Sequence, residues 1–462
     1  MSTASPPPAS APSTDAPLAG LATDPCVHCG FCLPTCASWR VLGTEMDSPR
    51  GRIHTLKALE AGELALDATV ASHFDTCLGC LACVSACPSG VRYDTLIEAT
   101  RPKLNAPALR GPGQRAFREL LFALLPYPGR LRALLQPLRA YAGTPLQALA
   151  RRVGLPGWLG PQVAAMERLL PALPPEAFQD PFPVLVPAQG ERRGRVGLLL
   201  GCVQRVFDPA VSQAAVQVLS ANGFDVVIPP DQGCCGAVTH HQGEEERTRH
   251  HALALMASFA AVVGPAGAAG PEPLDAVLVT ASGCGHTLKA YGRLLAEGEA
   301  TPDAAAAFAS TVADLQEFLE RVGLSDTFQR QLQPLTHGDG ASATARRPVQ
   351  LAYHDACHML HGQGLAEPPR ALLRRIPHVR VLEASEAGVC CGSAGIYNLV
   401  QPTEAEALGR IKANDLGATG ADLVVSANIG CTLQLRRHLG EASRPLPVAH
   451  PMELLARSAG LV

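Results

Sequence analysis

The sequence predicts a multidomain protein of mixed α+β and α/β class: an N-terminal domain built on cysteine clusters, a helical connector, and tandem α/β domains with parallel sheets. Two cysteine runs of equal spacing, "CVHCGFCLPTC" (26–36) and "CLGCLACVSACP" (77–88), lie within the first hundred residues. A stretch rich in Leu, Ala, Arg and Pro follows them, and the rest of the chain is an internal repeat. With 462 residues, 47% of them hydrophobic, the chain is long enough for about three domains.

The N-terminal part divides into a tail and a cysteine domain. Residues 1–19 are biased toward Pro, Ala and Ser, which predicts a disordered tail, and they lack the basic start and apolar run of a secretory signal. Residues 20–105 form the cysteine domain. Between its clusters, Ser48 is placed to cap a helix with Pro49 in its first turn and Ile53, Leu56 and Leu59 on one face. We expect this short helix to hold one cluster loop against the other.

The middle of the chain, residues 106–192, is predicted to be a helical connector. It shows helical periodicity in "FRELLFALL", has repeated prolines that end each run, and contains no cysteine. A second connecting segment, residues 325–347, is polar and carries Gly and Pro. We expect that segment to link the two halves of the repeat.

The repeat covers residues 193–324 and 348–462. "VGLLLGC" ending at Cys202 parallels "QLAYHDAC" ending at Cys357, and a Cys-Cys-Gly element recurs at 234–236 and 390–392. "DAVLVTASGC" (275–284) likewise parallels "DLVVSANIGC" (422–431). Each repeat therefore places cysteines just past short β-branched strands that alternate with helical text. Such alternation predicts a parallel sheet, and sites in such sheets form at the carboxyl ends of the strands.

The N-terminal cysteines have the spacing of a two-cluster, ferredoxin-like iron–sulfur domain. Three cysteines at three-residue intervals let one tight loop wrap a cubane 4Fe–4S cluster, and in the bacterial pattern the fourth cysteine of each run ligates the other cluster. The predicted ligands of the first cluster are Cys26, Cys29, Cys32 and Cys87. Those of the second cluster are Cys77, Cys80, Cys83 and Cys36. The alternative, structural zinc, normally uses two separated pairs of cysteines.

The repeats carry eight further cysteines, four in each. They are Cys202, Cys234, Cys235 and Cys284 in the first repeat, and Cys357, Cys390, Cys391 and Cys431 in the second. Their matched order argues against the ordinary interpretation of such cysteines as small buried hydrophobic residues. Adjacent cysteines do not chelate one ion comfortably. Three alternatives stand open: further iron–sulfur clusters, a strained redox disulfide, or zinc.

The motifs resemble a known family. The paired Cys-Cys-Gly elements are similar to the cysteine-rich domain of heterodisulfide reductase and of the iron-sulfur subunits of glycolate, D-lactate and anaerobic glycerol-3-phosphate dehydrogenases. With "DSPRGRI", "CLGCLACVSACPSGVRY", "YHDACH", "HGQG" and "CCGSAGIYNL", the chain from about residue 20 onward resembles the iron-sulfur subunit of glycolate oxidase.

The heterodisulfide reductase pattern ends in C-x-x-C and supplies five thiols to each noncubane cluster. Here Ala281 and Asn428 stand at the earlier position of that motif, which leaves four thiols per repeat for a further cluster. His286 and His358 are candidate substitute ligands. A His beside a metal site is more often a hydrogen-bonding neighbour of the ligands.

The resemblance implies an electron-transfer role. No segment joins a strand to a G-x-G-x-x-G turn and a helix, so we expect no flavin or nicotinamide on this chain and no catalytic residue of its own. The resemblance implies that FAD on a partner subunit oxidises glycolate to glyoxylate, and that this chain passes the electrons towards an acceptor such as quinone. The alternatives are the equivalent subunit of a D-lactate or glycerol-3-phosphate dehydrogenase, and a heterodisulfide-reductase-like catalytic subunit.

Charge and hydropathy exclude other classes of protein. A net charge of −3, with 17% charged residues, gives no polycationic surface, so we expect no nucleic-acid partner. The most apolar stretches are broken before they reach the ~20 residues that a spanning helix needs. We therefore expect no transmembrane segment and a cytoplasmic protein, peripheral on the inner face of the membrane if it meets quinone there.

Two further stretches have competing interpretations. Arg50 and Arg52 lie near the first cluster in sequence, where they either raise its potential or begin a solvent-exposed helix. "HHQGEEERTRHH" (240–251) is rich in His and Glu, and we interpret it as a solvated helix face rather than a metal site.

Overall fold

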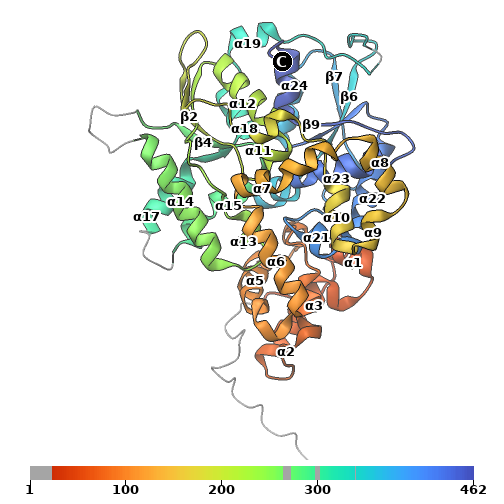
Figure 1. The fold of residues 1–462 in the computed structure, drawn as a ribbon. Coiled ribbons are helices and arrows are strands. Elements are labelled where there is room, and N and C mark those ends of the chain that lie inside the picture. Colours follow the sequence, from red (N-terminus) through yellow and green to blue (C-terminus); the bar gives the residue numbers. More distant parts are fainter. Residues whose placement is uncertain (1–22, 264–271, 297–301, 339) are drawn as a thin grey trace, which may run out of the picture.

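The computed structural model describes residues 23–263, 272–296, 302–338 and 340–462. The tail predicted for residues 1–19 lies outside them. The fold mixes helices and sheets, as predicted, with the cysteine domain at one end of the molecule and two sheets at the other (Figure 1). In the described residues every strand lies at Leu185 or later, so the α/β character belongs to the repeats.

The cysteine domain consists of short helices and loops in its described part. Its helices are α1 (Ala37–Leu42), α2 (Pro49–Glu60), α3 (Ala68–Asp75), α4 (Ala82–Ser85) and α5 (Tyr93–Thr100). The helix predicted between the two cysteine runs is confirmed as α2. Ser48 Oγ accepts a hydrogen bond from Gly51 N at 2.9 Å, Pro49 is the first helical residue, and the predicted apolar face is buried.

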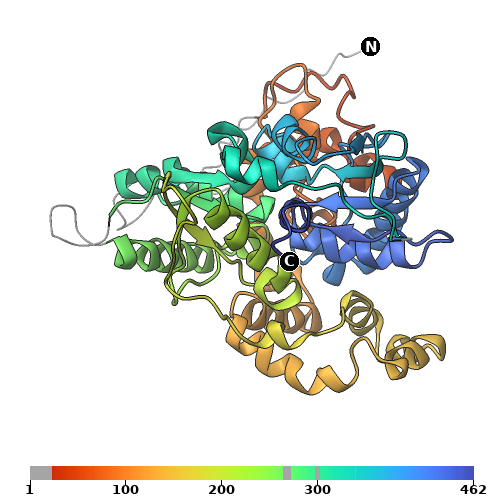
Figure 2. The same ribbon diagram turned by 90° about the horizontal axis from the view of Figure 1, so that it is seen from above.

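The connector is helical, as predicted, and each of its α-helices has a proline in the first two positions. These helices are α6 (Pro112–Leu124), α7 (Pro128–Leu135), α8 (Pro145–Arg152), α9 (Leu155–Trp158) and α10 (Pro161–Leu169). Proline suits a helix start because its missing N–H would have no partner there. The connector runs along one side of both α/β repeats, where α7 contacts α11 (Gln204–Phe207) and α10 contacts α22 (Pro402–Ala418) (Figure 2).

The two repeats build two sheets with the same strand order. The first sheet has the order β1-β3-β2-β4-β5, and the second has the order β7-β6-β8-β9. Apart from β1, which pairs antiparallel with β3, all neighbouring strands are parallel. The strands are β1 (Leu185–Val186), β2 (Gly194–Leu199), β3 (Phe224–Val227), β4 (Ala276–Val279), β5 (Val312–Asp314), β6 (Val349–His354), β7 (Val379–Leu382), β8 (Leu423–Ser426) and β9 (Val448–Ala449). The order β3-β2-β4-β5 thus recurs as β7-β6-β8-β9, which confirms the predicted parallel sheets.

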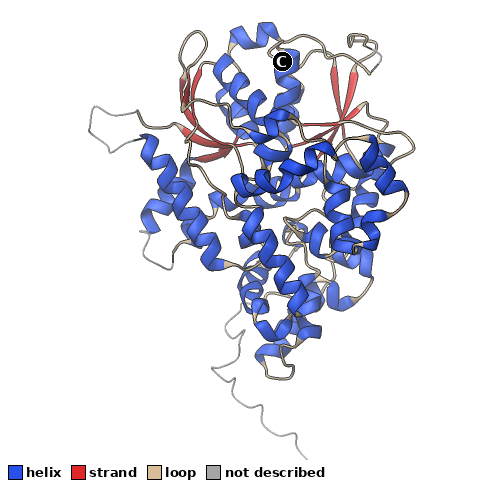
Figure 3. Cartoon of the chain, in the orientation of Figure 1, coloured by secondary structure: helices blue, strands red, loops and turns tan. Residues whose placement is uncertain are grey.

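The repeats pack against each other through their helices and share one hydrophobic core. Helix α24 (Pro451–Ser458) of the second repeat packs on α12 (Pro209–Ala221) of the first, and α18 (Leu315–Val322) of the first packs on α20 (Glu367–Leu373) of the second. These helices fill the space between the two sheets (Figure 3). A single cluster of buried side chains continues from one repeat into the other. The two repeats therefore hold each other in a fixed orientation.

Other helices complete the repeats. They are α13 (Ala237–His240), α14 (Glu245–Val263), α15 (Ser282–Lys289), α16 (Tyr291–Leu294), α17 (Pro302–Thr311), α19 (Asp326–Gln331), α21 (Tyr397–Val400) and α23 (Ile429–Gly440). Helix α19 lies in the segment expected to link the repeats, and its Phe328 is fully buried in the shared core. Residues 325–347 are the proposed linker, and part of this linker is packed like a domain interior.

Candidate metal centres

Two cavities in the cysteine domain are bordered by thiols. Cysteines from both runs surround the first cavity: Cys26, Cys29, Cys32 and Cys87, with Cys83 also at its wall. The second cavity is bordered by Cys36, Cys77, Cys80 and Cys83. The structure thus brings together each predicted set, including the crossed fourth cysteine. The two cavities adjoin, because Cys83 borders both. All-thiol donor sets gathered in this way fit 4Fe–4S clusters.

Donors from the surrounding loops point at the thiol sulfurs. Gly79 N lies 3.4 Å from Cys77 Sγ, and Val91 N lies 3.4 Å from Cys87 Sγ. The Tyr93 hydroxyl donates to Cys77 Sγ at 3.8 Å. Hydrogen bonds to sulfur favour the thiolate, which is the form that binds metal.

Arg52 is a buried cation at the second cavity. Its guanidinium, 1% exposed, donates to Ser38 Oγ at 3.0 Å and to Thr76 Oγ1 at 2.8 Å, and it lies 3.8 Å from the Asp47 carboxylate. The interpretation of Arg52 as part of an exposed helix start is therefore wrong. Arg52 also borders the second cavity rather than the first.

The thiols of the second cavity differ in the direction in which their pKa values are shifted. Burial raises the pKa of the Cys77 thiol, but the charges of Arg52 and Arg101 and the hydrogen bonds from Gly79 and Tyr93 together lower it more, so this pKa lies below its ordinary value. Burial instead raises the pKa of Cys80 and Cys83 above the ordinary value. Bound metal would compensate the cost of deprotonating these two buried thiols.

The first cavity is closer to solvent. Arg50 borders it and donates from Nη1 to the His28 carbonyl at 3.2 Å, and its Nε pairs with Glu45 at 2.7 Å. Cys29 is exposed, and beside it Val27 and Phe31 are 68% and 65% exposed. This loop is therefore an accessible apolar surface directly over one thiol set.

The thiols of the repeats meet at the carboxyl ends of the strands, as expected from the architecture. Seven of these eight cysteines border one cavity of about 130 Å³: Cys202, Cys234, Cys235, Cys284, Cys357, Cys390 and Cys431. In the first repeat, Cys202 Sγ lies 3.4 Å from Cys234 Sγ. The two repeats thus face each other across a shared cavity lined by thiols of both.

The glycine that follows each cysteine pair is required by the backbone. Gly236 and Gly392 have φ angles of 80° and 86°, in the left-handed region that side chains rarely adopt. A Cβ atom at Gly392 would also lie 2.9 Å from the Ala405 carbonyl oxygen. The tight turn that orients Cys390 and Cys391 therefore depends on glycine.

The second repeat adjoins the second thiol set of the cysteine domain. Cys80 and Leu78 pack in one small cluster with Cys357 and Cys390. The imidazole of His358 donates from Nε2 to the Gly79 carbonyl at 3.0 Å. His358 is thus a hydrogen-bonding neighbour of the cluster loop. Its ring centroid lies 4.6 Å from that of His286, the other histidine suggested as a substitute ligand.

The interpretation of residues 240–251 as a solvated helix face is wrong at its start. His240 Nε2 lies 3.2 Å from Glu98 of the cysteine domain. His241 borders the large cavity and stacks on His358 at 4.6 Å between ring centroids. Burial lowers the pKa of His241 well below its ordinary value, so its imidazole is neutral. These histidines belong to the interface between the first repeat and the cysteine domain.

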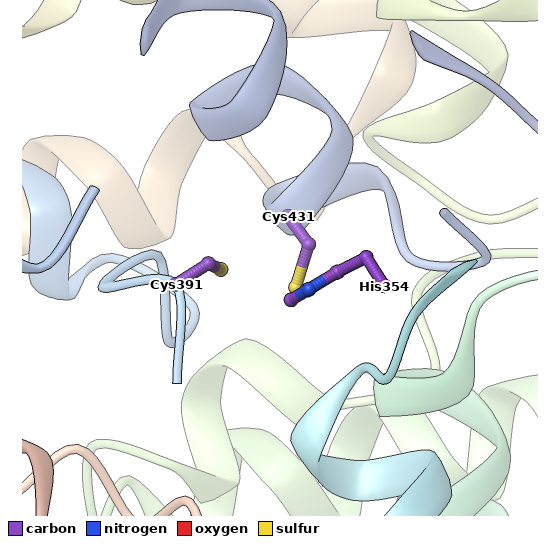
Figure 4. A group of neighbouring side chains, drawn as sticks. All are labelled: His354, Cys391 and Cys431. Atoms are coloured by element: carbon purple, nitrogen blue, oxygen red, sulfur yellow. The ribbon is translucent and has the colours of Figure 1, made fainter. Parts of the chain in front are cut away.

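A further group of potential ligands lies in the second repeat. One ligand atom each of His354, Cys391 and Cys431 lies within 4.8 Å of the other two, and all three residues are buried (Figure 4). Burial lowers the pKa of His354 to about 3, which keeps its imidazole neutral. No spacing rule or metal motif in the sequence singles out His354. Its only available signal was the comparison of the repeats, because Leu199 stands at the matching place in "VGLLLGC".

Comparison with known families agrees with this geometry. Residues 22–91 match the family described as "4Fe-4S dicluster domain", and residues 196–289 and 351–436 both match "Cysteine-rich domain". Residues 113–170 match "Glycolate oxidase iron-sulfur subunit, linker region". The iron–sulfur character of the chain and its duplicated cysteine-rich domains are thereby shown.

Curated relatives cover nearly the whole chain. The "Probable glycolate oxidase iron-sulfur subunit" of Bacillus subtilis is 33% identical over 439 residues, 94% of each chain. The "Glycolate oxidase iron-sulfur subunit" of Escherichia coli is 33% identical over 435 residues, 94% of this chain and 93% of that one. A lactate utilization protein of Shouchella clausii is 26% identical over 260 residues, 56% of this chain and 98% of that one.

Proposed function

Because the chain belongs to the family of glycolate oxidase iron-sulfur subunits, we propose that it is the electron-transfer subunit of a glycolate oxidase complex. A separate FAD-bearing subunit oxidises glycolate to glyoxylate, and this chain conducts the electrons towards an acceptor such as quinone. The observation that carries the proposal is the pair of adjoining thiol-lined cavities in the cysteine domain. When bound, 4Fe–4S clusters supply one-electron transfer at such sites.

The proposed ligands are the two crossed sets of four cysteines. Cys26, Cys29, Cys32 and Cys87 hold one centre, and Cys36, Cys77, Cys80 and Cys83 hold the other. The surroundings of the two sets suggest a path for the electrons. The first set lies under the exposed loop of Val27 and Phe31, and the second set lies against the thiols of the second repeat. The exposed loop is accordingly the proposed docking surface for the partner subunit.

None of the helices in the described ranges combines the length and the hydropathy that a membrane span requires. We propose a cytoplasmic location, with contact to the inner face of the membrane where the acceptor is quinone. In this proposal the substrate binds to the partner subunit, so the sequence of this chain does not determine which substrate is oxidised. The corresponding subunit of a D-lactate or glycerol-3-phosphate dehydrogenase therefore remains the alternative, and reduction of the assembled complex by each substrate in turn distinguishes them.

The test of the relay uses Cys29→Ser and Cys80→Ser, one variant in each set. In the complex with the flavin subunit, each variant should abolish glycolate-dependent reduction of an artificial acceptor while glycolate still reduces the flavin. Iron and acid-labile sulfide, measured after anaerobic purification, should be about eight of each per wild-type chain if only these two centres are filled. Acceptor reduction that continues unchanged in both variants would refute the proposal.

The cavity between the repeats favours a second candidate function, disulfide reduction like that of heterodisulfide reductase. Thiols of both repeats border this cavity, as a site that meets a disulfide would require. Ala281 and Asn428 stand against it, since both replace a thiol of the C-x-x-C pattern and both border the same cavity. Turnover of a heterodisulfide by the purified chain with a reduced viologen would favour this function, and its absence would exclude it.

A further inference from the structure

The second repeat differs from the first at three buried positions beside its thiols. Matched by their spacing from the cysteines, His354, Ser393 and Ser426 correspond to Leu199, Ala237 and Val279, respectively. The three side chains of the second repeat are polar, and their counterparts in the first repeat are apolar. The reverse holds at two other positions, where Thr280 and Ser282 of the first repeat stand opposite Ala427 and Ile429 of the second. The one difference that supplies a metal ligand is the imidazole of His354.

These polar side chains lack partners. His354, Ser393 and Ser426 are at most 2% exposed. Neither imidazole nitrogen of His354 and neither of the two hydroxyls has a hydrogen-bond partner among the described residues. Buried polar atoms without partners are rare in proteins, because each loses its hydrogen bonds to water and gains none in return. A bound ion at such a place offsets this free-energy cost.

The imidazole of His354 points at two thiols. His354 ends strand β6, in register with Ser426 of β8, while Cys391 lies in the loop after β7 and Cys431 in the first turn of α23 (Figure 4). One ligand atom of each lies within 4.8 Å of the others. Around a tetrahedral ion with bonds of about 2.0–2.3 Å, ligand atoms lie about 3.3–3.8 Å apart, so small side-chain adjustments close the set.

The spacing favours a single ion. In a cubane each thiolate binds a different iron, so the sulfurs stand apart by the width of the whole cluster. The noncubane cluster of the heterodisulfide reductase pattern takes five thiols, and this repeat has four because Asn428 replaces the fifth. One imidazole nitrogen with two thiolates is instead a donor set that zinc prefers.

We propose that His354, Cys391 and Cys431 bind one zinc ion, and that this site exists only in the second repeat. The first repeat keeps the two matching cysteines, Cys235 and Cys284, but has Leu199 in place of the imidazole. The proposal goes beyond the electron relay, which uses the cysteine domain. The two proposals can therefore fail separately.

The test compares three full-length variants with the wild type, all purified anaerobically, incubated with Zn²⁺ and desalted through a mild chelator. His354→Leu installs the residue of the first repeat, and His354→Gln keeps a polar side chain of similar size. His438→Leu is the matched control, because His438 is another buried histidine of the second repeat and already has a partner in Gln434. Iron content and visible absorption of the cysteine domain report whether each variant is folded.

The wild type and His438→Leu should each retain about one zinc per chain, and zinc-edge X-ray absorption should show one imidazole nitrogen with sulfur ligands. Both His354 variants should lose the imidazole signal and bind zinc at least tenfold more weakly. Three results would overturn the proposal: no zinc retained by the wild type, a ligand sphere without nitrogen, or zinc and imidazole scattering unchanged in a folded His354 variant. The iron count of the cysteine domain, measured on the same samples, tests the relay independently.

Discussion

Arg52→Gln should lower the reduction potential of the centre held by Cys36, Cys77, Cys80 and Cys83. The guanidinium lies 3.0 Å from Ser38 Oγ, and that oxygen lies 3.3 Å from Cys36 Sγ, so the positive charge is at most about 6 Å from this sulfur. Reduction adds a negative charge to the centre. Removing a nearby cation therefore makes reduction less favourable.

The size of the effect follows from Coulomb's law. At about 6 Å and an effective dielectric constant of about 20, one unit charge contributes about 3 kcal/mol, which is about 120 mV for a one-electron couple. The Asp47 carboxylate, 3.8 Å from the guanidinium, does not cancel this difference, because it is present in both proteins. The predicted shift is thus negative and on the order of 100 mV.

The assay is a redox titration followed by electron paramagnetic resonance on the full chain. Arg52→Lys keeps the charge and should shift the potential much less. Arg50→Gln removes a partly exposed cation at the other cavity, where solvent screens it, and should also have a smaller effect. Arg52→Gln takes one cation away from the buried Asp47 carboxylate, which keeps its contacts with Thr44, His73 and Thr76. Arg52→Gln/Asp47→Asn, which removes both charges of the pair, serves as the counterpart if Arg52→Gln alone does not fold. A titration in which Arg52→Gln and Arg52→Lys have equal potentials would refute this reasoning.

Two carboxyl groups predict opposite dependences of stability on pH. Burial raises the pKa of Asp314, the N-cap of α18, to about 6. Because this folded pKa lies above the unfolded pKa, the free energy of unfolding should fall by up to about 3 kcal/mol as the pH rises from about 4 to about 6. Asp314→Asn should flatten this slope in denaturant unfolding, and an unaltered slope would contradict it. Burial also raises the pKa of Glu98, but His240 and Arg293 lower it more, to about 2, so its contribution is present above about pH 4.5 and is lost as the pH falls towards 2. Glu98→Gln should lower the melting temperature at pH 6 and leave it nearly unchanged at the acid end; equal losses at both would exclude this linkage.

The sequence was sufficient for the features that repeat or have strict spacing. The matched "DAVLVTASGC" and "DLVVSANIGC" predicted strands β4 and β8 with a cysteine past each carboxyl end, and both are found there. The spacing of the N-terminal runs predicted which cysteines gather at each cavity. Local spacing determines which face or strand end a residue occupies. The crossed fourth cysteines, which are distant in sequence, follow instead from the two-cluster pattern.

Contacts between segments that are distant in the sequence could not be predicted from local patterns, for a physical reason. Arg52 is four residues past Ser48 on α2, but its charge serves the second thiol set because helix α2 packs that face inward. His241 pairs with His358 across the interface of two domains. A local pattern of polar residues does not indicate whether a neighbouring domain will cover that end of a helix, because the burial arises from tertiary packing.

The internal duplication itself shows that the two halves no longer have the same role. A repeat whose only task was to complete the fold would keep the same kind of residue at matching buried positions, because both halves have the same strand order and share one core. The second half instead replaces Leu199 and Val279 by His354 and Ser426, in register on neighbouring strands. It also contacts the cysteine domain through His358 and Cys390. Unpaired polar groups destabilise a core, so the unpartnered imidazole of His354 beside two thiols indicates chemistry rather than folding as the reason for the difference.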